Sequence, residues 1–155
     1  MKTSIVTGTI ALLLAFAGAS IAQAAPGNVR QGGKVANFAL PGEGHDSPRF
    51  ESLSFWSGPN GKTIDYEYGA DQQRVSLRAI GPSADGKGFA VKFPNGLVLD
   101  VVPRDGALHV SDRDGRYDKT FEWQYEGPVD GRGTFCSPCV EKGDAIGFVR
   151  EHFME

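Results

Sequence analysis

Apolar and polar residues alternate along most of the chain from Phe50 to Tyr125. In the run 63–68, for example, Ile64, Tyr66 and Tyr68 are separated by polar residues. Strict alternation over several residues is typical of β-strands that bury one face. The other runs span residues 74–79, 88–93, 97–102, 108–110 and 117–125. The pattern therefore predicts a chain built mainly from strands.

Short turn signals separate these runs. Asn60-Gly61, Asn95-Gly96 and Asp105-Gly106 are pairs that tolerate the positive φ of tight hairpin turns. The strands recur about every 10–12 residues, a spacing typical of antiparallel sandwiches and barrels. No crossover helix lies between them, as a parallel sheet would need. We predict an all-β fold, an antiparallel meander of about seven strands that forms a curled sheet, a barrel or a sandwich.

The last residues follow a different period. Ile146, Val149 and Phe153 fall at positions i, i+3 and i+7, and Asp144 is suited to cap a helix over 145–153. A helix this short depends on packing rather than on its own propensity. We therefore predict a short C-terminal α-helix that packs on the sheet.

The N-terminal part has the composition of an export signal. Lys2 precedes an uncharged apolar run over residues 5–21, and Ala22-Gln23-Ala24 matches a signal-peptidase site. The alternative, a membrane anchor, is disfavoured because glycine, serine and threonine interrupt the run. We predict a signal peptide over 1–24, a flexible Gly/Pro-rich leader over 25–48, and a single β domain over 49–155. Within the leader, the apolar segment 35–40 can dock as a short strand.

The charge balance limits the partners. The formal net charge of the chain is −3. Removal of the predicted signal peptide, which contains Lys2, makes it −4. Nucleic acid needs clustered Lys and Arg, which this sequence lacks, so it is not an expected partner. After signal cleavage no apolar segment is long enough to span a bilayer. The expected location is the periplasm or the exterior, with an envelope or extracellular protein or glycan as partner.

The two cysteines, Cys136 and Cys139, lie in a CxxC pair after a glycine-rich bend. Export favours a structural disulfide that secures the start of the helical segment. The spacing also suits a redox pair, although such motifs usually precede a helix in a βαβ unit. Metal binding would need further ligands, and no second CxxC exists. We predict no cofactor and no metal site.

The aromatic residues supply the remaining candidates. Buried core packing is the ordinary role of such side chains, but tyrosine and tryptophan also form grooves that bind sugars, peptides or protein loops. The candidate binding residues on or beside the predicted strands are Trp56, Tyr66, Tyr68, Trp123 and Tyr125.

The sequence contains no constellation that names a nucleophile, a base and an oxyanion donor, and we predict no enzyme and no catalytic residue. The expected function is that of an exported, soluble, non-enzymatic binding protein of the cell envelope, with an inhibitor or immunity-type role as one form of it. The alternative is a thiol-dependent redox or metal-binding protein that uses Cys136 and Cys139. A weaker third hypothesis is a barrel that holds a small apolar ligand.

Overall fold

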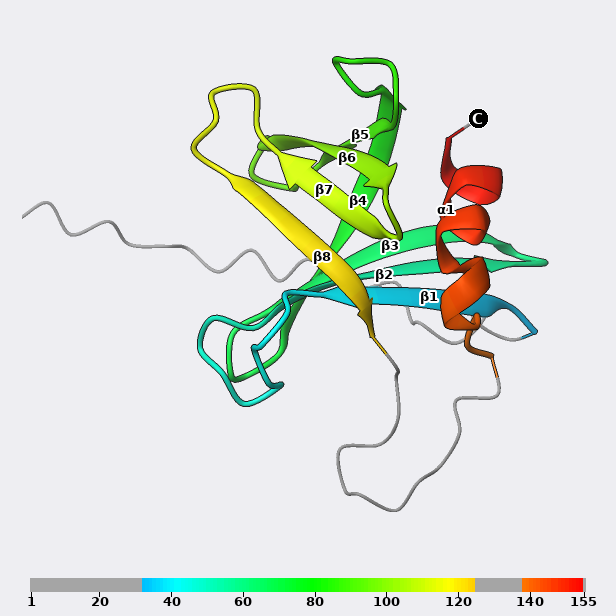
Figure 1. Cartoon of the computed structure of the whole chain (residues 1–155), viewed down its shortest axis with the longest axis horizontal. Coiled ribbons are helices and arrows are strands. Elements are labelled where there is room, and N and C mark those ends of the chain that lie inside the picture. The colour runs from blue at the N-terminus through cyan, green and yellow to red at the C-terminus, as the bar shows by residue number, and fades with distance from the viewer. Residues whose placement is uncertain (1–31, 125–137, 155) are drawn as a thin grey trace, which may run out of the picture.

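The chain folds into a closed barrel of eight antiparallel strands, with one α-helix following the last strand (Figure 1). The computed structural model describes residues 32–124 and 138–154. The strands are β1 (Lys34–Ala39), β2 (Glu51–Gly58), β3 (Gly61–Tyr68), β4 (Gln73–Pro82), β5 (Phe89–Lys92), β6 (Val98–Arg104), β7 (Ala107–Ser111) and β8 (Asp118–Gln124). A 3₁₀ turn, Lys142–Asp144, leads into α1 (Ala145–Phe153).

The predicted all-β meander with a C-terminal helix is confirmed. Each strand pairs with the next in the chain, and β8 pairs with β1, which closes the barrel. The strand beyond the predicted seven is β1, the apolar segment that the sequence placed in the leader. Its register with β2 runs from Lys34 opposite Ser57 to Ala39 opposite Ser52. The barrel therefore starts well before Arg49, the first residue of the predicted β domain.

The core fills the barrel because the alternating apolar residues point inward. Phe55 on β2 lies at its centre, fully buried, and its ring contacts those of Phe38, Phe89 and Phe153. The other buried core residues of the strands include Ala36, Leu53, Ile64, Leu77, Val91, Leu99, Val101, Leu108, Val110 and Phe121. The period of two in the sequence is thus the direct source of the core.

Strand β4 forms a corner of the barrel. Its first half, Gln73–Leu77, pairs with β3, whereas Arg78–Pro82 pairs with β5. The register shifts between Ala79 and Gly81, as expected of a β-bulge that bends a strand. Figure 1 shows β4 passing from the β3 side of the barrel to the β5 side.

Strand β1 forms a second corner. Residues 37–39 pair with β8, but the N-terminal end of β1 receives a later segment of the chain instead. Cys139 lies beside Val35 in a parallel bridge, with hydrogen bonds of 2.9 Å from Val35 N to Pro138 O and from Val140 N to Val35 O. The Trp123 indole donates to the Val140 carbonyl at 3.3 Å and fixes this segment to β8.

Helix α1 packs against one end of the barrel. Ala145, Phe148, Val149 and Phe153 are buried against the strand core, and the Arg150 guanidinium donates to the Pro103 carbonyl at 2.9 Å. Asp144 is the N-cap residue, as predicted, but its side chain makes no capping hydrogen bond. Within the described part of the chain, no helix is long and apolar enough to cross a membrane.

Candidate functional site

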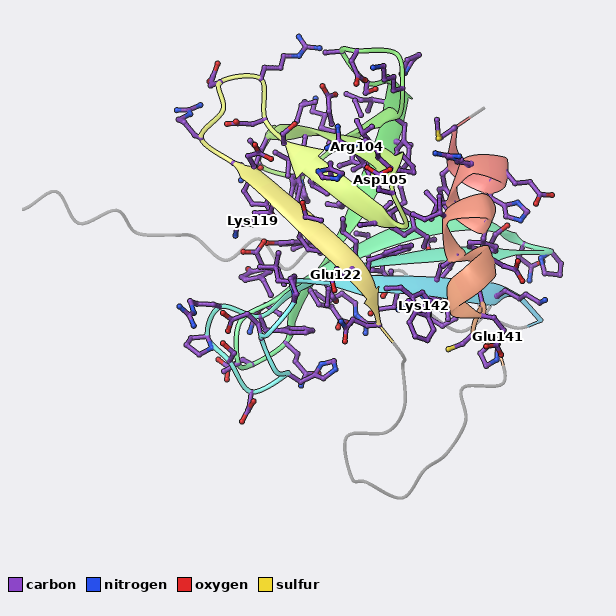
Figure 2. All side chains as sticks on the ribbon, viewed as in Figure 1. Arg104, Asp105, Lys119, Glu122, Glu141 and Lys142 are labelled. Atoms are coloured by element: carbon purple, nitrogen blue, oxygen red, sulfur yellow. The ribbon has the colours of Figure 1, made fainter. Side chains whose placement is uncertain are left out.

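Charged and aromatic side chains meet inside the barrel, away from α1. Glu51 lies opposite Tyr68 in the β2–β3 register, and Lys119 lies opposite the buried Val110 in the β7–β8 register. Directly opposed residues of antiparallel strands point to the same face. Glu51 and Lys119 therefore share the inner face with the core. Figure 2 shows Lys119 on β8, on the side of the barrel away from α1.

Glu51 is the centre of a hydrogen-bonded group. The Tyr117 hydroxyl donates to Glu51 Oε2 at 2.5 Å, and the Lys119 ammonium donates to Glu51 Oε1. The same ammonium lies 4.7 Å from the centroid of the Tyr117 ring, within the range of a cation–π contact. The Glu51 side chain is only 13% exposed, so its charge depends on these partners. We call Glu51, Tyr66, Tyr117 and Lys119 the Glu51 cluster.

Two further aromatic rings, Tyr68 and Phe93, border this cluster and pack against Tyr66. The Tyr66 and Tyr68 rings stack with centroids 5.5 Å apart and planes 22° apart. Phe93 packs edge-on against Tyr66 at 5.2 Å. Tyr66 is partly buried, whereas Tyr68 is 41% exposed. The stack therefore leads from the Glu51 cluster to solvent and offers an aromatic surface at this end of the barrel.

Burial and the Glu51 carboxylate change the acidity of two tyrosines. Burial is the largest cause, followed by the negative charge of Glu51 and its hydrogen bonds, and together they raise the pKa of Tyr66 and Tyr117 far above the ordinary value. Both phenols consequently stay protonated above the pH at which an ordinary tyrosine ionises, and they can act as hydrogen-bond donors.

These two phenols should resist ionisation until the barrel opens. In the unfolded chain a tyrosine ionises near pH 10, whereas Tyr66 and Tyr117 keep their protons in the folded state. Above pH ~10 the unfolded state therefore binds fewer protons, and the free energy of unfolding should fall as the pH rises. Absorbance at 295 nm, followed together with circular dichroism, should show a late phenolate step that coincides with unfolding.

The variants Tyr66→Phe and Tyr117→Phe should each reduce the amplitude of that late step. A normal titration of every tyrosine below the unfolding transition would contradict the assignment.

The structure places the residues predicted from sequence in different regions. Tyr66 and Tyr68 come together at the end of the barrel away from α1. Trp123 packs on the core opposite Phe38 and bonds to Val140, while Trp56 lies on β2 opposite Val35 and is half-buried. The described residues therefore do not assemble these four side chains into one groove. Tyr125 lies outside the described residues.

The cysteine predictions also reach beyond the described part of the chain. Cys139 is placed beside Val35 at the β1 corner, but Cys136 lies outside the described residues. The disulfide, redox and metal-binding interpretations of the pair stay predictions. Among the described residues, no group of three or more His, Cys, Asp or Glu side chains could hold a metal ion.

The sequence interpretation missed Glu51, Tyr117 and Lys119 as site residues. The available signal was their phase: Glu51 lies two residues before Leu53, and Lys119 lies two residues before Phe121. A charged side chain in phase with core residues must be paired, or must lie at an end of the barrel. Here both conditions hold. Glu51 and Lys119 pair with each other, and Lys119 lies on the side of the barrel away from α1.

Comparisons of this chain with protein-family models, with curated proteins and with solved structures found no match.

Proposed function

We propose that this protein is an exported, non-enzymatic binding module of the cell envelope that contacts its partner through the barrel end away from α1. The observation that carries the proposal is the exposed Tyr68 ring, held in a stack on Tyr66 above the Glu51 cluster. Tyrosine combines a large apolar face with a polar tip at low entropic cost, which suits it to recognition.

The internal hydrogen bonds of the cluster favour binding over chemistry. Both Glu51 oxygens accept hydrogen bonds, one from Tyr117 and one from Lys119. The raised pKa values make the phenolate form of either tyrosine even less accessible than it is in water, so neither is poised to act as a base. A buried network whose members are satisfied makes its surroundings rigid. A rigid aromatic surface loses little conformational entropy when a partner binds, and affinity benefits accordingly.

The partner class follows from the surface that is offered. The Tyr68 ring can stack on a sugar ring or on an apolar side chain of a protein loop, while hydroxyl groups supply hydrogen bonds. The predicted signal peptide and acidic charge place such a partner in the envelope or outside the cell. An inhibitor or immunity-type role, in which the module shields envelope components, fits this location and remains part of the proposal.

Tyr68→Ala should weaken partner binding at least about tenfold, as expected when an aromatic anchor is truncated at an interface. Because the Tyr68 ring is partly exposed but stacks on Tyr66, its removal should lower the free energy of unfolding by only about 1 kcal/mol and leave the barrel folded. The purified exported protein would be immobilised and tested for retention of envelope proteins and, separately, of isolated envelope glycan.

Glu151→Ala is the control, since Glu151 is exposed on α1 and lies away from Tyr68. If the two variants retain the same material in the same amount as the unchanged protein, the proposed binding end is wrong.

A further inference from the structure

The second half of β4 has a free edge. Arg78–Pro82 pairs with β5 on one side, and the pairing of β3 with β4 stops at Ile64 opposite Leu77. Among the described residues, no strand pairs with the other side of Arg78–Pro82. All five of these residues are exposed, and Ile80 is 48% exposed. Such an edge presents main-chain groups to which another strand can bind.

A pocket lies between this edge and α1. It has a volume of about 240 Å³ and is lined by Lys62, Thr63, Ile64, Leu77, Ala79, His152 and Phe153. Ile64, Leu77 and Phe153 make its apolar part and belong to the core. The Thr63 hydroxyl oxygen is shielded from solvent and has no hydrogen-bond partner among the described residues. What the pocket offers to a ligand is therefore mainly its apolar surface.

At the β1 corner of the barrel, a strand edge of this kind is paired with another segment of the same chain. At the N-terminal end of β1, the segment from Pro138 to Val140 lies along Val35 and exchanges two main-chain hydrogen bonds with it. The chain thus extends its own sheet at one corner through a single parallel β-bridge. At the β4 corner, no described segment occupies the equivalent position.

The charge around the β4 corner differs from that of the whole protein. Arg78 and Lys92 are paired across β4 and β5, and Lys62 and His152 line the pocket. Arg78 and Lys92 form no ion pair with another described residue, whereas the formal net charge of the chain is −3. This basic border favours an acidic occupant.

We propose that the β4 corner binds an extended acidic segment of a partner protein by strand addition. The segment pairs with main-chain groups of Arg78–Gly81 and places one apolar side chain in the pocket beside Phe153. Its acidic side chains lie near Arg78 and Lys92. Pro82 has no N–H to donate, and the bulge at Ala79 and Gly81 bends the edge, so the added strand is short.

The proposal is tested with a random library of linear peptides displayed on phage, selected on the purified exported protein. Enriched sequences should carry acidic residues beside one large apolar residue. A synthetic peptide from the enriched set should slow hydrogen exchange at Arg78–Gly81 and leave Tyr66 and Tyr68 unaffected. In a fluorescence anisotropy titration, Arg78→Glu should weaken its binding about fivefold or more. Arg113→Glu, an exposed change in the β7–β8 turn, is the matched control and should have no effect.

Several results would overturn the proposal. These are the absence of any enriched peptide, enrichment of basic peptides, equal binding by the Arg78→Glu and Arg113→Glu variants, or exchange protection at the Tyr68 end instead. A concentration-dependent dimer that loses its contact on Arg78→Glu would assign the edge to a second copy of the chain. The proposal is independent of the Tyr68 site, because Tyr68→Ala should leave peptide binding unchanged.

Discussion

Gly88→Ala should destabilise the barrel by about 3 kcal/mol or more, or prevent its folding. Gly88 precedes β5 and lies directly against β6. A Cβ at this position would stand 2.0 Å from the Val101 carbonyl oxygen and 2.8 Å from the Val102 Cα. Both obstacles are backbone atoms, so they cannot turn away as a side chain could. The Gly88 amide also donates to the Ser83 hydroxyl at 2.8 Å, which ties the position to the loop after β4.

Chemical denaturation monitored by circular dichroism measures this effect. Gly143→Ala is the matched control, because a Cβ at Gly143 meets no atom within 4 Å. The control should remain within about 0.5 kcal/mol of the unchanged protein. Equal stability of the two variants would show that β5 and β6 are not packed as closely as described.

Phe153→Ala should cost about 3–4 kcal/mol, which is a large part of the stability of a domain of this size. The Phe153 ring is 8% exposed and lies 5.3 Å from the Phe55 ring, 6.4 Å from Phe89 and 6.4 Å from Phe148. Its removal leaves a cavity where α1 meets the barrel core. The same change removes one wall of the pocket at the β4 corner.

The measurement is the free energy of unfolding of Phe153→Ala, compared with Glu151→Ala on the exposed side of α1. The control should be nearly neutral. If Phe153→Ala were also neutral, α1 would contribute no packing energy and would not be part of the folded core.

Much of the fold was predictable because each strand carries its burial pattern in its own residues. The alternation at Ile64 and Tyr66, and the helical spacing of Val149 and Phe153, depend only on local order. Closure of the barrel was not predictable, because it requires β1 and β8, which lie at distant positions in the sequence. The short apolar run of β1 within a Gly-rich segment could not reveal that it completes the ring.

The candidate binding site was predictable only in part. Tyr66 and Tyr68 were named from the sequence as aromatic residues of a strand, and tyrosines two apart on a strand share a face, which explains why the structure places their rings together. Glu51 and Lys119 were not found, because their pairing joins β2 to β8 and only the register of the closed barrel brings them together. The alternating pattern alone indicates that the charged side chain of Glu51 or Lys119 faces inward, but it does not identify the residue with which that side chain pairs.

The parallel bridge at the β1 corner has a consequence for the order of folding. The Val35 amide donates to the Pro138 carbonyl and the Val35 carbonyl accepts from the Val140 amide, so the first strand is completed by residues close to α1. Contacts between such distant parts of a chain raise the contact order, and high contact order slows folding. During synthesis the N-terminal end of β1 therefore stays unpaired on that side until residues 138–140 have been made.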